Sequence, residues 1–156
     1  MREGGGCMYE FSQDYEELAH AVIDALPELW FIRDAEIRIG FLRSWKEKRT
    51  GGKLVYGECI RLPELYQDLL SLDFFVVIYE ANAAALTLNQ KKILMWHELL
   101  HVGIDDSSGE PKYVVNPHDR EEFDSIISRA GLRWDEPGAD VPDILVGNGR
   151  TVIPRE

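Results

Sequence analysis

The sequence predicts an α+β fold, in which a small twisted sheet of three to four strands packs against an N-terminal helix and a central helix, with a further helix towards the C-terminus. Apolar residues recur at helical spacing over residues 14–26 and 88–101, whereas residues 37–42, 54–62 and 74–79 form the short alternating or continuous apolar runs of strands. Because the chain has 156 residues, 45% of them apolar, we expect one domain with a substantial core.

The elements before the central helix follow from spacing and turn residues. The first helix is predicted over residues 14–26 and ends before Pro27, and we expect it to pack across the sheet. A strand over residues 37–42 is joined to a second strand over residues 54–62 through a glycine-rich turn. A short helix or irregular segment over residues 65–72 and a buried strand over residues 74–79 complete this half.

The central helix carries the most informative motif in the chain. Thr87 and Gln90 form a capping box, and the helix over residues 88–101 contains no proline or glycine before Gly103, which is a plausible C-terminal stop. Apolar residues share a face with the two histidines of the motif, so both histidines point inward. The last turn matches HExxH as His97-Glu98-Leu99-Leu100-His101.

This spacing suits a catalytic zinc ion. Residues four apart lie on the same helix face, so His97 and His101 can both direct a ring nitrogen at one Zn²⁺. Zinc then needs a third protein ligand and keeps one position open for water. Glu98 lies about 100° around the helix, where its carboxylate can reach that water and act as the general base. The motif therefore predicts a zinc-dependent peptidase.

The third zinc ligand is expected after the motif. Asn116 and Pro117 are typical of the N-cap and first residue of a helix, which would run to about residue 130 and end at Gly131. His118 would lie in the first turn of that helix, and it is the preferred third ligand. Its second ring nitrogen could bond to a neighbouring carboxylate or carbonyl.

Two glutamates remain as alternative third ligands. Glu121 and Glu122 follow His101 by 20 and 21 residues, a separation compatible with a carboxylate ligand supplied by the following helix. The ordinary interpretation of both is a solvated acidic first turn, which the helix dipole favours. The metzincin pattern is excluded, because Ile104 and Ser107 stand where it requires glycine and histidine.

These segments resemble known metallopeptidases. The order of strand, HExxH helix, linker and second histidine resembles the small zincins of the SprT and Spartan type, and it is still more similar to the small phage metallopeptidase domain of viral and prokaryotic genomes. The similarity covers about residues 14–134 and is most specific in the HExxH motif and in His118-Asp119-Arg120-Glu121-Glu122-Phe123. It implies a zincin-like fold, zinc bound by His97, His101 and His118, and Glu98 as the general base. It also implies a peptide or protein substrate, bound as an extended strand at the cleft.

The domain organisation follows from composition. We expect a flexible N-terminus over residues 1–13, a zincin-like domain over residues 14–134, and a Pro/Gly-rich acidic tail over residues 135–156 that is mobile or loosely docked. The tail could instead form a small hairpin or lie in the cleft as an inhibitory segment. Cys7 and Cys59 lack CxxC spacing, so a cysteine zinc ribbon is excluded. No signal-peptide or membrane-spanning run is evident, so we expect a cytoplasmic monomer without a membrane partner.

Charge argues against a general nucleic-acid partner. The formal net charge is −11, whereas phosphate binding needs a basic surface. Residues 33–53 nevertheless hold seven basic and three acidic residues, so this Arg33–Lys53 segment could touch nucleic acid, as a Spartan-like protease acting on nucleic-acid-bound proteins would require. A solvated hairpin is the more ordinary interpretation.

Two further points remain open from the sequence. A non-catalytic zinc-binding interaction module is the alternative to an enzyme, although a structural zinc site has no use for a general base such as Glu98. Tyr79, Tyr113 and Arg120 are candidates for a contact that stabilises the oxyanion of the reaction.

Overall fold

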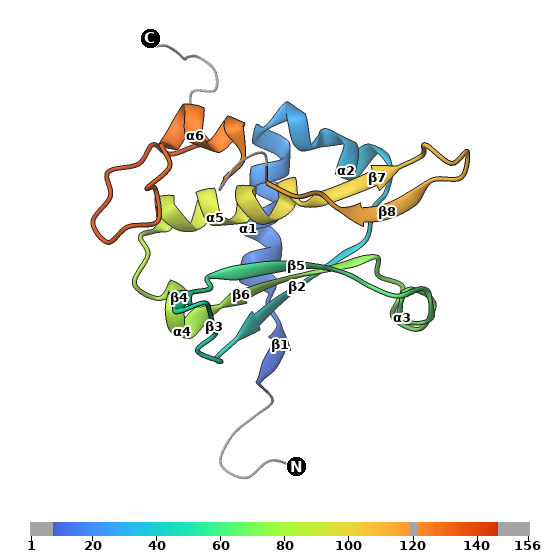
Figure 1. Ribbon diagram of the computed structural model, residues 1–156, viewed down its shortest axis with the longest axis horizontal. Coiled ribbons are helices and arrows are strands. Elements are labelled where there is room, and N and C mark those ends of the chain that lie inside the picture. The colour runs from blue at the N-terminus through green and yellow to red at the C-terminus, as the bar shows by residue number, and fades with distance from the viewer. Residues whose placement is uncertain (1–7, 119–121, 147–156) are drawn as a thin grey trace.

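The computed structural model describes residues 8–118 and 122–146, and its centre is a four-stranded mixed sheet with the order β1-β2-β6-β5 (Figure 1). The central strands β2 and β6 are parallel, and β1 and β5 run antiparallel to them at the two edges. The strands are β1 (Tyr9–Phe11), β2 (Ile39–Ser44), β5 (Gly57–Arg61) and β6 (Phe74–Tyr79). The predicted α+β class and small sheet are therefore confirmed.

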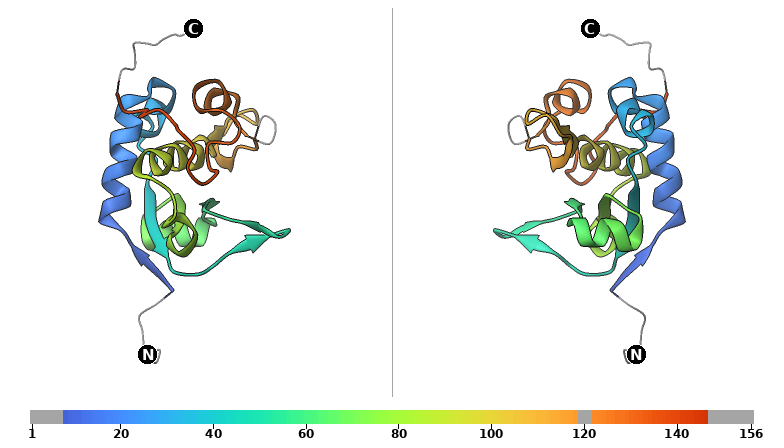
Figure 2. Two further views of the ribbon diagram at one scale, coloured as in Figure 1. Left: turned by 90° about the vertical axis from the view of Figure 1, so that its left-hand side faces the viewer. Right: turned by 90° about the vertical axis from the view of Figure 1, so that its right-hand side faces the viewer.

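Two 13-residue helices, α1 (Gln13–Ala25) and α5 (Leu88–Leu100), cover one face of this sheet, and α6 (Asp124–Ala130) packs against α5 (Figure 1). The structure also has two short hairpins, β3 (Arg49–Thr50) with β4 (Lys53–Leu54), and β7 (Val102–Asp105) with β8 (Lys112–Val115). Figure 2 shows that the β3–β4 hairpin extends away from the rest of the domain. The remaining short helices are η1 (Pro27–Leu29), α2 (Trp30–Asp34), α3 (Glu64–Leu70) and α4 (Glu80–Ala83).

Both long helices begin at side-chain caps. The Ser12 hydroxyl accepts a hydrogen bond from the Tyr15 backbone N–H at the start of α1. At the start of α5, Thr87 and Gln90 form the predicted capping box, in which each side chain accepts from the other residue's backbone N–H. These bonds satisfy N–H groups that the first helical turn leaves without an intrahelical partner.

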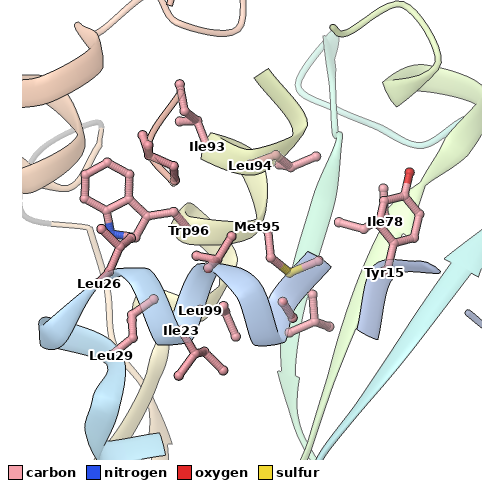
Figure 3. Close-up of a cluster of buried hydrophobic side chains, with 14 of the residues drawn as sticks. Tyr15, Ile23, Leu26, Leu29, Ile78, Ile93, Leu94, Met95, Trp96 and Leu99 are labelled. Atoms are coloured by element: carbon pink, nitrogen blue, oxygen red, sulfur yellow. The ribbon is translucent and has the colours of Figure 1, made fainter. Parts of the chain in front are cut away.

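The core lies between these helices and the sheet. Figure 3 shows side chains from α1 and α5, among them Ile23, Met95 and Leu99, meeting in one layer that continues to Ile78 of β6. A smaller cluster of Leu42 and Val77 with Tyr79 lies on the other face of the sheet. The buried layer packs α5, which carries the HExxH motif, against the sheet.

Several predicted boundaries differ from the structure. The strand expected over residues 54–62 is divided between β4 and β5, because Leu54 pairs with Arg49 in the β3–β4 hairpin, whereas Gly57–Arg61 pair with β6 in the main sheet. The helix expected from Asn116 is wrong at its start: β8 ends at Val115, and the helix α6 begins only at Asp124. The β7–β8 hairpin that separates the two helices was not predicted. Its residues pair with each other and not with the main sheet.

The ends of the domain also differ from the predicted division. Residues 9–11 belong to β1, which pairs with β2, although residues 1–13 were expected to be flexible. Beyond residue 134, Ile144 is fully buried in the core and Val141 is nearly so. The packed unit thus extends past both predicted boundaries. The alternative hairpin or inhibitory segment involves residues 144–153. Residues 144–146 form a turn and not a strand, and residues 147–153 lie outside the described residues.

Within the part of the chain that the structure describes, no helix is both long enough and apolar enough to cross a bilayer.

Candidate metal centre

Three histidine side chains converge beside the end of α5. His97 lies in the last turn of this helix, His101 is its C-cap, and His118 lies in the segment between β8 and α6. The Nε2 atom of His118 is 3.0 Å from Nε2 of His97 and 3.1 Å from Nε2 of His101. The tertiary structure therefore brings together the three histidines that the sequence suggested, although His118 does not lie on a helix.

The contacts of His101 orient its ring. Its Nδ1 lies 2.5 Å from the backbone carbonyl oxygen of Asn116, which can only accept a hydrogen bond. The proton of the neutral ring is therefore on Nδ1, and Nε2 presents a lone pair to the other histidines. Burial lowers the pKa of His101, which favours this neutral form.

Nδ1 of His97 faces a carboxylate, whereas Nδ1 of His101 faces a backbone carbonyl. Its Nδ1 lies 2.6 Å from Oε1 of Glu122, which is an ion-pair distance, although the oxygen lies off the N–H direction. Burial lowers the pKa of His97, but the carboxylates of Glu122 and Glu98 outweigh that effect and the net shift is upward. The surroundings of His97 thus favour positive charge, which a metal ion would supply.

The three nitrogens fit a metal ion. A tetrahedral site with Zn–N distances of roughly 2.0–2.1 Å separates its nitrogens by roughly 3.3–3.4 Å, so the observed spacing needs only a small outward movement. The lone pairs of His97 and His101 face the same point, and neighbouring lone pairs repel each other unless a proton or a cation lies between them. His97, His101 and His118 could therefore hold a metal ion.

Glu98 lies next to this cluster. Its Oε2 is 3.9 Å from Nε2 of His97, and its side chain is buried. Burial penalises the charged carboxylate and raises the pKa of Glu98 to about 7, although His97 acts in the opposite direction. A carboxylate with such a pKa can both take up and release a proton near neutral pH.

Gly57 makes room for Glu98, a role that the sequence did not reveal. A Cβ atom added at Gly57 would lie 3.1 Å from Oε2 of Glu98 and 3.1 Å from the carbonyl oxygen of Val77. Gly57 begins the edge strand β5, so the edge of the sheet approaches the carboxylate at this point. The only signal in the sequence was a glycine inside the strand predicted over residues 54–62, because an interior glycine often marks a close approach of another group.

Glu122 and Glu121 were the alternatives to His118 as the third metal ligand, and the structure describes only Glu122. Glu122 is buried, but its carboxylate lies on the Nδ1 side of His97, away from the converging Nε2 atoms. Burial would raise the pKa of Glu122, but the contact with His97 and the bonds from Phe123 and Trp134 lower it. Glu121 lies outside the described residues, as does Arg120.

The two tyrosines considered for the oxyanion contact have other partners. The Tyr79 hydroxyl donates a hydrogen bond of 2.6 Å to Glu58, on the face of the sheet that α1 and α5 do not cover. Tyr113 lies on β8 and packs edge-on against Phe74 at the start of β6. Neither contact places a hydroxyl at the histidine cluster.

The basic residues between Arg33 and Lys53 are spread over several elements, from α2 to the β3–β4 hairpin. Four of them lie close to acidic side chains: Arg33 to Asp24 at 3.1 Å, Arg38 to Asp73 at 2.9 Å, Arg43 to Glu80 at 3.2 Å, and Lys48 to Glu58 at 2.8 Å. Their positive charge is therefore largely compensated locally, and nucleic-acid contact through this segment stays a prediction.

A family model described as "Putative phage metallopeptidase" matches residues 7–144 of the chain, which includes every residue of the histidine cluster. The name of the family implies a bound metal ion, and the cluster could bind one. Searches of curated proteins and of solved structures gave no match.

Proposed function

This chain belongs to the phage metallopeptidase family, and from that premise we propose that it is a zinc-dependent peptidase with His97, His101 and His118 as metal ligands and Glu98 as the general base. One observation carries the proposal: three imidazole Nε2 atoms converge beside a buried carboxylate. Three protein ligands with a fourth position open are typical of catalytic zinc sites, and imidazole suits zinc well. The small sheet backed by α1 and α5 supports a zincin-like fold.

Zinc bound at this site would supply a Lewis acid that polarises a peptide carbonyl and lowers the pKa of a water molecule towards about 7. Glu98 is placed beside the ligand set and not within it, so its carboxylate is available for proton transfer. It would accept a proton from the attacking water and pass it to the leaving amine. The buried surroundings of Glu98 keep bulk water from competing for that proton.

The substrate in this proposal is an extended peptide. Within the described residues, β5 pairs in the sheet only with β6, so its outer edge offers backbone groups to an added strand. Gly57 at the start of β5 lies against Glu98, so a peptide bound along this edge would pass close to the proton-transfer group. Backbone pairing of this kind gives affinity with limited sequence preference.

The test combines metal content with peptide cleavage. We expect one zinc per chain in wild type and in Glu98→Gln, loss of zinc in His118→Ala, and cleavage of an unbiased peptide library that falls at least 10²-fold in Glu98→Gln. A chelator should abolish cleavage, and added zinc should restore it. Wild type that binds no zinc after reconstitution would refute the proposal. Zinc binding without cleavage would favour the non-catalytic module.

A further inference from the structure

The Glu122 carboxylate is buried and faces three nitrogens. Its Oε1 lies 2.6 Å from Nδ1 of His97 and accepts a hydrogen bond of 2.8 Å from the Phe123 backbone N–H. Its Oε2 accepts a hydrogen bond of 2.9 Å from the indole Nε1–H of Trp134. A buried carboxylate is costly without such partners, so these contacts determine its orientation closely.

Trp134 is itself held by α5. Its indole is buried, and its backbone carbonyl accepts a hydrogen bond of 2.9 Å from Nε2 of Gln90. The same Gln90 nitrogen donates to the carbonyl of Glu136 at 2.9 Å. Gln90 is fully buried and lies about two turns before His97 on the same helix. The contacts therefore form a closed chain from α5 through Trp134 and Glu122 back to α5.

We propose that Glu122 is a positioning residue that holds His97 with Nε2 towards the metal, and that the segment after α6 acts through Trp134 to hold Glu122 in place. This inference rests on the proposed metal centre. Outer carboxylates that bind the second nitrogen of a histidine ligand fix its tautomer and ring orientation. In this assignment Glu122 is not a metal ligand. The segment after α6, most of which composition predicted to be a tail, helps to set the geometry of the site.

The chemistry requires a glutamate at this position. Glu122 presents one acceptor oxygen to His97 and the other to Trp134. Glutamine has one oxygen and one NH₂ group, so it can accept either on the side of His97 and Phe123 or on the side of Trp134, and not on both. An NH₂ group facing Nδ1 of His97 would drive the ring proton to Nε2, which removes the lone pair that the metal needs.

The test uses Glu122→Gln, Trp134→Phe, the double variant, and Arg133→Ala as a control. Arg133 neighbours Trp134, but its side chain is 80% exposed and contacts Glu136. Phenylalanine keeps the aromatic packing of residue 134 and removes only the N–H donor. Zinc affinity is measured by competition with a chromophoric chelator, and the visible spectrum is recorded at saturating Co²⁺.

We expect Glu122→Gln to weaken zinc binding by about 10–100-fold, and Arg133→Ala to leave it unchanged. Without the Trp134 donor, the introduced glutamine side chain can turn its NH₂ group away from His97, so the effect of Glu122→Gln should be several-fold smaller in the Trp134→Phe background. The cobalt spectrum at saturation should match wild type in all variants, because the three ligands are the same. Unfolding midpoints show whether each variant is folded. If Glu122→Gln does not fold, the zinc affinity of Trp134→Phe can still be compared with that of wild type.

Two results would overturn the positioning role while leaving the proposed function intact. Zinc affinity of folded Glu122→Gln within twofold of wild type would show that His97 does not depend on Glu122. A changed cobalt spectrum at saturation would show that Glu122 is a ligand. By contrast, wild type that binds neither zinc nor cobalt would refute the proposed function and this inference with it.

Discussion

Asn116 and His101 are joined by two contacts of the Asn116 main chain. The Asn116 N–H donates to the backbone carbonyl of His101 at 2.7 Å, and the Asn116 carbonyl oxygen lies 2.5 Å from the His101 ring Nδ1. The Asn116 side-chain amide also donates to the carbonyls of Leu100 and Val102. Asn116 thus fixes the end of α5 and the orientation of a proposed metal ligand at the same time.

Gly103→Ala should disturb this arrangement. A Cβ atom at Gly103 would overlap the Asn116 side chain, which would have to leave its present position. We expect a loss of about 1–3 kcal/mol in the free energy of unfolding and weaker zinc binding, because the side-chain bonds of Asn116 to Leu100 and Val102 would break and the Asn116 carbonyl that orients His101 would be held less firmly. Urea unfolding and zinc competition measure both effects. Ser107→Ala in the β7–β8 loop is the control, and an unchanged zinc affinity in Gly103→Ala would argue against the role of Asn116.

Gly57→Ala should affect hydrolysis more than metal binding. The added Cβ would displace the Glu98 carboxylate, whereas the three histidines lie on other segments. A contact of 3.1 Å requires the carboxylate to give by a few tenths of an ångström. Since misplacement of a proton-transfer group by about 1 Å can cost on the order of 10²-fold in rate, we expect a kcat that is lower by roughly 3–10-fold, with zinc content unchanged. Ile60→Ala, on the same strand and exposed, is the matched control. Equal kcat in both variants would contradict the proposed place of Glu98.

Ile144→Ala should destabilise the whole domain. Ile144 is fully buried, whereas Val146 two residues later is 65% exposed. Truncation of a buried isoleucine to alanine typically costs about 2–5 kcal/mol, and truncation of an exposed valine costs little. We therefore expect a large shift of the urea midpoint in Ile144→Ala and almost none in Val146→Ala. Similar midpoints for the two variants would restore the view of this segment as a loosely docked tail.

The ion pair between Lys92 and Asp143 should make docking of the same segment dependent on pH. The Nζ atom of Lys92 lies 2.9 Å from Oδ2 of Asp143. Burial acts to raise the pKa of Asp143, but the hydrogen bond from Lys92 outweighs burial, and the net shift is downward. A carboxyl whose pKa is lower in the folded state stabilises the fold above its unfolded pKa of about 3.9, and that stability is lost as pH falls through the folded value.

Asp143→Asn should therefore be less stable than wild type by about 0.5–1 kcal/mol at pH 7. The difference should shrink below about pH 4 and vanish once Asp143 is protonated in the folded protein. Urea unfolding at several pH values, in the presence of a chelator so that metal loss does not contribute, measures this difference. A difference that is constant between pH 7 and pH 2.5 would show that the charge of Asp143 is not responsible.

The sequence by itself determined the parts of this protein that depend on near neighbours in the chain. Capping by Thr87 and Gln90, helical spacing and the buried run over residues 74–79 correctly predicted α5 and β6, because caps and side-chain periodicity act within a few residues. The HExxH spacing placed His97, Glu98 and His101 at the end of that helix for the same reason. Their metal-binding and catalytic roles stay predictions.

Only the tertiary structure decided the features that depend on distant residues. The local pattern at Asn116 fits a helix N-cap, but the N–H and carbonyl of Asn116 both contact His101, and no helix begins there. Glu122 faces His97 because Trp134 binds its other oxygen, and Trp134 is in turn held by Gln90. Such contacts join residues far apart in sequence, and their strength comes from burial and exact geometry, which spacing along the chain does not encode.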